Sequence, residues 1–209
     1  MKTFLRLAAL SLGLAASAHA LVFTFTPNPS DLGDLDHTNA TTWGINWNAI
    51  PPGHVITGAK IKIDNIWDWK REDDALFIRL LDDPKKGVTH YSDNTNDNLL
   101  SDYFAGQGIA LTTWSDPNGG NNGANSTDFV YTFTATQLSL LTSYITDPTA
   151  ANRAVFGLSF DPDCHYYNSG VCFEITTAPA SVPDASPTAL LLGVAAAGLM
   201  LVSRPRRTV

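Results

Sequence analysis

Asp outnumbers Glu by 18 to 2 in this chain of 209 residues, and that imbalance constrains its fold more than any other feature. Asp favours turns and loops, whereas Glu favours helices. Gly, Asn, Ser, Thr and Pro are spread through the same chain and separate short apolar stretches. This composition is typical of many short strands joined by polar loops, rather than of a helical bundle.

Alternating apolar and polar residues mark the expected strands. In residues 55–66, Ile61 and Ile63 alternate with Lys60 and Lys62, which predicts a central strand with one face in the core. Other strands are expected at residues 21–26, 42–48, 75–81, 109–114, 129–134, 153–160 and 171–176. The segment 75–81 is apolar on both faces except for Arg79, so we expect it to be buried on both sides.

The stretch 82–102 is polar and predicts a long surface excursion, while one helix is expected between residues 136 and 147. Thr136 can cap this helix, and Asp147 precedes a proline that ends it. The apolar residues of one helical face are Leu138, Leu141 and Ile145. We therefore predict an all-β fold, an antiparallel β-sandwich of jelly-roll type with one short helix, forming one domain over residues 21–178.

The N-terminus has the three parts of a secretory signal peptide. Lys2 and Arg6 give a basic start, residues 5–18 are apolar, and Ala18-His19-Ala20 is a small-x-small cleavage site. Residues 1–20 are therefore expected to direct export and to be removed, which would leave a mature chain that begins near Leu21.

The C-terminus combines a short motif, an apolar run and a basic tail. The motif consists of Val182, Pro183, Asp184, Ala185 and Ser186. Residues 189–202 are apolar, and three arginines follow them. This order predicts a linker with a sorting motif over residues 179–187 and a hydrophobic helix over residues 188–209, whose basic end stays in the cytoplasm.

The charge of the region between these ends limits its partners. Residues 21–181 hold 8 basic and 19 acidic side chains, a net charge of −11. A phosphate backbone would repel this charge, so nucleic acid is not an expected partner. Cations, neutral sugars and basic surfaces are compatible with it.

Two resemblances follow from these residues. The VPDAS motif with its apolar run and basic tail resembles a PEP-CTERM sorting signal of the Val-Pro-Asp-Ser-Gly type. The resemblance implies an exosortase-type enzyme in the membrane as a partner. The body is similar to an uncharacterised family of exported β-sandwich proteins through the segments DNIWDWKREDDALFIRLLD, TATQLSLLTSYI and FGLSFDPDCHYYNSGVCFEI. This second resemblance implies a β-sandwich fold and export from the cell, and it implies no catalytic residues.

The loop DPDCHYYNSG has the highest density of candidate ligands in the body. Asp161, Asp163 and Asn168 offer hard oxygen atoms, which could bind calcium if backbone carbonyls and water complete the coordination. The spacing does not follow an EF-hand. Alternatively, Asp161 and Asn168 cap turns and form hydrogen bonds with the local backbone.

The only two cysteines, Cys164 and Cys172, lie at the two ends of this loop. In an exported protein they are candidates for a disulfide. If Phe160 and Phe173 belong to paired strands, a bridge across the hairpin could bring the two Cα atoms to a separation of about 5.5 Å. We therefore predict a Cys164–Cys172 disulfide.

A second concentration of functional side chains is the segment NIWDWKREDD. Its candidate sugar-binding residues are Trp67, Trp69, Asp68, Asp73 and Asp74. Tryptophan rings stack on the apolar faces of sugars, and carboxylates accept hydrogen bonds from sugar hydroxyls. The alternative is that the tryptophans belong to the core and the acids to a solvated turn.

No enzyme is expected, because the chain lacks G-x-S-x-G, H-E-x-x-H, P-loop and G-x-G-x-x-G motifs. The leading interpretation is an exported structural or adhesive component of the cell surface or of an extracellular polysaccharide matrix. The second is a carbohydrate-binding, lectin-like module that could depend on calcium, and the third is an extracellular hydrolase. The hydrophobic C-terminal helix would attach each of these to the membrane, transiently or permanently.

Overall fold

The computed structural model describes residues 19–180, apart from residues 34, 48, 69–73, 94–100, 117–123 and 125. The chain divides into two units, Met1–Pro179 and Ala180–Val209, and the first holds all the strands and the helix described below. Most of the expected signal peptide, sorting motif and C-terminal hydrophobic helix lies outside the described residues. No helix of the described part is long and apolar enough to cross a membrane.

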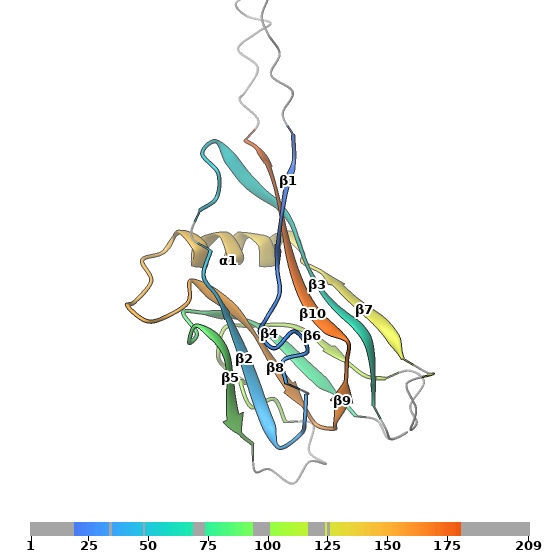
Figure 1. The fold of residues 1–209 in the computed structure, drawn as a ribbon. Coiled ribbons are helices and arrows are strands. Elements are labelled where there is room, and N and C mark those ends of the chain that lie inside the picture. Colours follow the sequence, from blue (N-terminus) through green and yellow to red (C-terminus); the bar gives the residue numbers. More distant parts are fainter. Residues whose placement is uncertain are drawn as a thin grey trace, which may run out of the picture. The chain divides into compact units, whose positions relative to one another are not determined.

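The first sheet has the strand order β1-β10-β3-β7, and all its neighbours are antiparallel (Figure 1). The strands are β1 Leu21–Phe25, β3 His54–Asp68, β7 Thr127–Thr132 and β10 Gly170–Pro179. A short strand, β9 Tyr166–Tyr167, pairs with the end of β3. The prediction of a central strand at residues 55–66 is confirmed, because β3 lies between β10 and β7 and buries Ile61 and Ile63.

The second sheet has the order β5-β2-β8-β4-β6 and is also antiparallel. Its strands are β2 Asn39–Ile45, β4 Leu76–Asp82, β5 Gly87–Ser92, β6 Ile109–Trp114 and β8 Phe156–Pro162. The prediction that residues 82–102 form only a surface excursion is wrong, because β5 lies within them. β5 is an edge strand whose residues are exposed or half-buried on both faces, so it has no marked apolar alternation.

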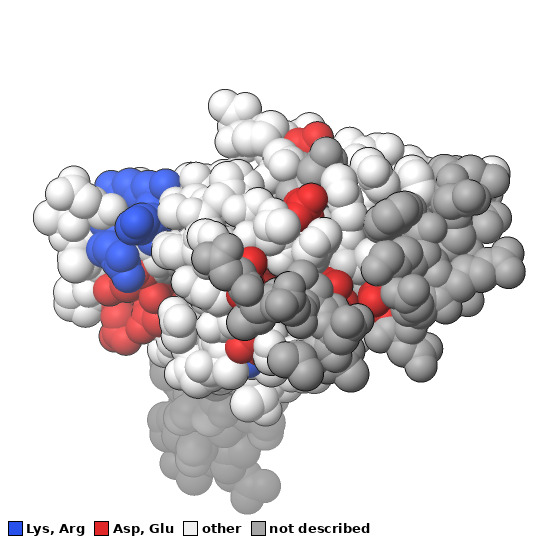
Figure 2. Space-filling model, turned by 90° about the horizontal axis from the view of Figure 1, so that it is seen from below, with Lys and Arg blue, Asp and Glu red and all other residues white. Residues whose placement is uncertain are grey.

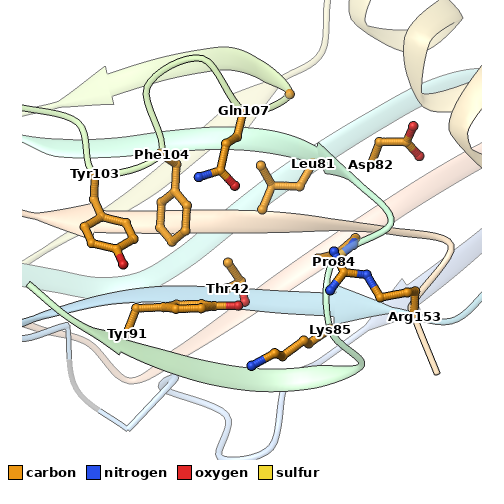
Figure 3. Close-up of a pocket in the computed structure, with 11 residues that line it drawn as sticks. Thr42, Leu81, Asp82, Pro84, Lys85, Tyr91, Tyr103, Phe104, Gln107 and Arg153 are labelled. Atoms are coloured by element: carbon orange, nitrogen blue, oxygen red, sulfur yellow. The ribbon is translucent and has the colours of Figure 1, made fainter.

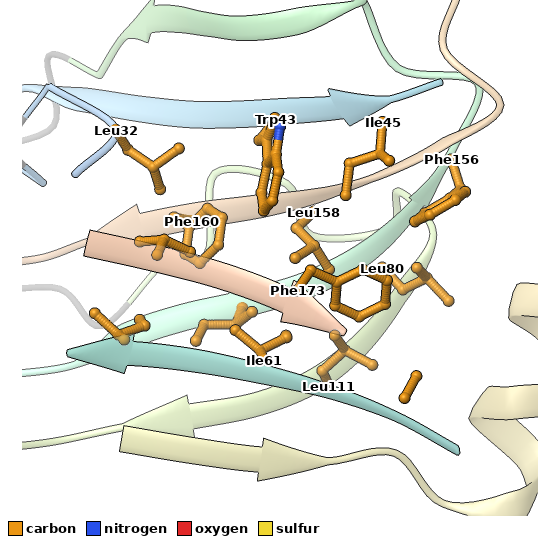
Figure 4. Packing of buried hydrophobic residues seen from close by; sticks show 14 of the residues in the cluster. Leu32, Trp43, Ile45, Ile61, Leu80, Leu111, Phe156, Leu158, Phe160 and Phe173 are labelled. Carbon is orange, nitrogen blue, oxygen red and sulfur yellow. The ribbon is translucent and has the colours of Figure 1, made fainter. Parts of the chain in front are cut away.

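Side chains from the facing surfaces of both sheets form one core (Figure 4). Phe173 of β10 is fully buried at its centre. Its ring centroid lies 5.5 Å from that of Phe133, 5.7 Å from that of Phe156 and 6.3 Å from that of Phe25. The fold is therefore an all-β, antiparallel β-sandwich with one helix, as the composition and alternation predict.

The helix α1 spans Ala135–Thr146 and contacts β3 and β8, one strand from each sheet. Its N-cap is Thr134, which corrects the prediction of Thr136. Thr134 accepts a hydrogen bond from the N–H of Gln137, and the Gln137 side chain accepts one from the N–H of Thr134 at 2.8 Å. This reciprocal capping box needs a Gln or Glu three residues after the cap, and Thr136 is followed by Ser139 at that position.

Candidate functional site

The two segments singled out in the sequence meet in space at the end of β3. β9 pairs with β3 there, so that Trp67 lies opposite Tyr167 and Asp68 opposite Tyr166. The Trp67 and Tyr167 rings are stacked, with centroids 4.5 Å apart and planes at 21°. The His165 ring also stacks on Tyr167, at 4.2 Å. The loop DPDCHYYNSG and the segment NIWDWKREDD are therefore parts of one site.

At the same end of β3, two carboxylates and one thiol converge. One ligand atom from each of Asp68, Asp74 and Cys164 lies within 4.8 Å of the other two, and all three residues are buried. Asp68 is the last residue of β3, and its N–H donates a hydrogen bond of 3.1 Å to Asp116. Asp74 precedes β4, and Cys164 lies between β8 and β9. We call these three residues the acid–thiol cluster.

Burial governs the electrostatics of the acid–thiol cluster. It raises the pKa of the Cys164 thiol to about 12, and a hydrogen bond and the negative charge of Asp74 add to the shift. Burial also raises the pKa of Tyr166, with further contributions from Asp163 and Asp74. With no cation in the site, the thiol is therefore protonated at neutral pH and is a poor nucleophile.

The predicted disulfide is wrong, because Cys164 and Cys172 are both free. Phe160 and Phe173 lie in strands of different sheets, so the connecting segment crosses the sandwich instead of forming a hairpin. Cys164 is buried in the core beside Asp74. Cys172 alternates with the buried Val171 and Phe173, so it lies on the outer face of β10, opposite Lys62.

The predicted sugar-binding residues do not form an exposed surface in the described structure. Asp68 and Asp74 are buried, so their carboxylates cannot reach the hydroxyls of a bulky sugar. One face of the Trp67 ring is covered by Tyr167. Trp69 and Asp73 lie outside the described residues, as do the sorting-motif residues 182–186.

The three candidate calcium ligands each form a hydrogen bond with the backbone of a different segment. Asp161 accepts one from the N–H of Tyr103 at 2.6 Å, and Asp163 accepts one from Ala75. Asn168 donates one to the carbonyl of Asp31 at 3.1 Å. The bonds of Asp161 and Asn168 reach distant segments, so they are not the local backbone bonds of the alternative interpretation. Calcium binding stays a prediction.

A pocket of about 210 Å³ on the second sheet was not predicted from the sequence (Figure 3). Its lining includes three aromatic side chains and both signs of charge. These residues are Tyr91, Tyr103, Phe104, Lys85, Arg153 and Asp82. Tyr91 lies within the polar stretch 82–102, and Tyr103 and Phe104 follow it directly. Aromatic residues in a polar stretch were the only feature of the sequence that could have indicated a binding site there. We call this feature the aromatic pocket.

Two strands of the second sheet anchor the turn that carries Tyr103 and Phe104. Arg79 of β4 forms an ion pair of 2.5 Å with Asp102 and donates a hydrogen bond of 2.7 Å to the carbonyl of Gln107. From β8, Asp161 accepts the N–H of Tyr103. These contacts hold the turn over the outer face of the sheet.

The aromatic pocket has the chemical groups of a small polar binding site. The Tyr91 and Tyr103 ring centroids lie 6.1 Å apart, and the ammonium of Lys85 lies 5.5 Å from the centre of the Tyr91 ring. The Thr42 hydroxyl in its lining is buried and, within the part of the chain that the structure describes, has no hydrogen-bond partner. A sugar ring could stack on the exposed Tyr103, and its hydroxyls could bond to the polar groups.

Acidic side chains are visible at several places on the end of the sandwich shown in Figure 2, whereas most of the visible basic ones gather at one side. No protein-family model and no curated protein sequence matches the chain.

Proposed function

We propose that the chain is an exported structural or adhesive protein of the cell surface or extracellular matrix, delivered by an exosortase-type sorting system. The observation that carries this proposal is the tripartite C-terminus, whose motif begins with Val182 and Pro183, behind a β-sandwich domain. The N-terminal basic and apolar segments support export. Sandwiches of this type commonly serve as rigid display and adhesion modules, although fold alone does not assign function.

We also propose that the sandwich is of jelly-roll type. Strands β1, β10, β3 and β7 form one sheet, and β2, β8, β4 and β6 are successive neighbours in the other. This order supports two interlocked Greek keys, with β5 added at the edge beside β2.

Processing in cells tests the sorting proposal. The full-length chain would be expressed in a bacterium with and without an exosortase, followed by fractionation and mass measurement of the product. We expect loss of the N-terminal segment in both strains, and loss of the C-terminal segment only with the enzyme. The double variant Val182→Ala and Pro183→Ala should keep its C-terminus in both. An uncut chain in the cytoplasm would contradict the proposal.

A second candidate function is carbohydrate binding, which the aromatic pocket favours. The full-length chain in detergent would be applied to a polysaccharide array that includes acidic glycans, since Lys85 and Arg153 line the pocket. We expect retention that Tyr103→Ala abolishes and that the exposed control Val130→Ala leaves unchanged. If Trp67→Ala abolishes retention and Tyr103→Ala does not, the glycan binds at the end of β3 and not in the aromatic pocket. A chelator arm tests the calcium dependence.

A further inference from the structure

We propose that Asp68, Asp74 and Cys164 bind one divalent transition-metal ion of the zinc class. Their ligand atoms lie within 4.8 Å of one another, and they come from three separate segments of the chain. A tetrahedral zinc ion with bonds of about 2.0 to 2.3 Å holds its ligand atoms about 3.5 Å apart, so small side-chain shifts would bring all three onto one ion.

A second observation at the same place points to a missing ligand. The hydroxyl of Tyr166 is fully buried and, among the described residues, has no hydrogen-bond partner. Tyr166 lies directly opposite Asp68 in the pairing of β9 with β3, which places it beside the acid–thiol cluster. One oxygen of Asp74, which is 9% exposed, also lacks a hydrogen-bond partner within the described structure. Buried polar atoms are rarely left unsatisfied, and a metal ion with a bound water would satisfy both.

The donor set selects the class of ion. Calcium and magnesium take oxygen ligands, whereas a cysteine thiolate favours zinc and related transition metals. Two buried carboxylates this close repel each other, and a divalent cation offsets their charge. Binding displaces the thiol proton of Cys164 to solvent.

The ion would join three elements at one end of the sandwich. Asp68 ends β3, Asp74 precedes β4, and Cys164 precedes β9. β3 and β4 belong to different sheets, so the metal cross-links the two sheets. Cys164, which forms no disulfide, would be one of its ligands. The ion would therefore stabilise the fold, and its loss should lower the free energy of unfolding.

The test uses the full-length chain in detergent, stripped with a chelator and then loaded with zinc or cobalt. Cys172→Ser is a matched control, since it leaves Cys164 as the only thiol in the chain. We expect about one zinc per chain in the wild type and in Cys172→Ser, as a single zinc site requires. The cobalt forms should show a thiolate-to-cobalt charge-transfer band. Cys164→Ser should lose the band, and both Cys164→Ser and Asp74→Asn should lose tight zinc binding.

Circular dichroism of the stripped proteins shows whether each variant folds. If Cys164→Ser does not fold, the charge-transfer band of Cys172→Ser still decides the question, because only Cys164 can produce it. Three results would overturn the proposal: no zinc in the wild type, no thiolate band in Cys172→Ser, or equal zinc affinity in a folded Cys164→Ser variant.

Discussion

The indole ring of Trp67 lies flat against the phenol ring of Tyr167, with centroids 4.5 Å apart. This stack joins the end of β3 to β9, one residue before Asp68 of the acid–thiol cluster formed by Asp68, Asp74 and Cys164. It also explains why Trp67 is poorly placed as a sugar platform, since one face of its ring is already occupied.

The stack itself can be measured with a double-mutant cycle of Trp67→Leu and Tyr167→Leu. We expect a coupling free energy of about 0.5 to 1.5 kcal/mol, the usual range for an aromatic pair beyond its burial. Equilibrium unfolding in urea gives the four stabilities. Tyr167→Leu also removes the contact between His165 and Tyr167, and the cycle cancels this effect because it occurs with and without Trp67. Strictly additive effects would contradict the importance of the pair.

Truncation of Phe173 should be among the most damaging changes in the core. Phe173→Ala removes a fully buried ring in contact with three others, and a loss of about 3 to 5 kcal/mol in unfolding free energy is expected. Val130, which is 54% exposed on β7, provides the control. Val130→Ala should change stability by no more than about 0.5 kcal/mol.

The N-cap of α1 can be tested against its neighbour. Thr134→Ala breaks the capping box and should cost about 1 kcal/mol. Thr136→Ala lies inside the helix, where Ala is favourable, so it should be neutral or slightly stabilising. The two melting curves, recorded side by side, distinguish the observed cap from the one expected from the sequence.

Asp161 should make the protein less stable as the pH rises from about 4 to about 7. Burial, with the charges of Asp93 and Asp102 adding to it, raises the pKa of Asp161 from 3.8 to about 7, although the N–H of Tyr103 opposes the shift. The folded state then holds a proton that the unfolded state releases. The contribution is complete below pH 3.8 and is lost as the pH approaches 7. In Asp161→Asn, urea unfolding over this interval should lose less stability than in the wild type.

Glu174 provides a comparison of opposite sign. Hydrogen bonds from Lys60 and Lys62, both at 2.8 Å, lower the pKa of this carboxyl. Its stabilising contribution is present above the ordinary pKa of 4.5 and is lost as the pH falls below it. Glu174→Gln should therefore weaken the fold at neutral pH and approach the wild type in acid. Parallel pH curves for the two variants would contradict both assignments.

Most strands could be predicted from the sequence because alternation is a local property. In β3, each inward Ile61 or Ile63 is followed by an outward lysine or aspartate. β5 could not be predicted in this way, because an edge strand with both faces partly in solvent needs no apolar period. The prediction of a hairpin between β8 and β10 is wrong, since no local pattern tells whether two consecutive strands share a sheet.

The candidate site shows the same limit. Asp68, Asp74 and Cys164 were each singled out from the sequence, but for sugar binding and for a disulfide. Their convergence depends on the pairing of β3 with β9, which joins distant parts of the chain. The aromatic pocket depends likewise on Arg79, which draws the turn around Asp102 onto the second sheet.

Strand β10 is the neighbour of both β1 and β3 in the first sheet, yet it is the last of the strands to be synthesised. In a chain that leaves a ribosome or crosses a membrane N-terminus first, β1 cannot pair with β10 until β10 has emerged. Until that moment the edges of β1 and β3 that pair with β10 have no partner strand. Closure of the first sheet is thus a non-local step that has to wait for the last strand of the chain.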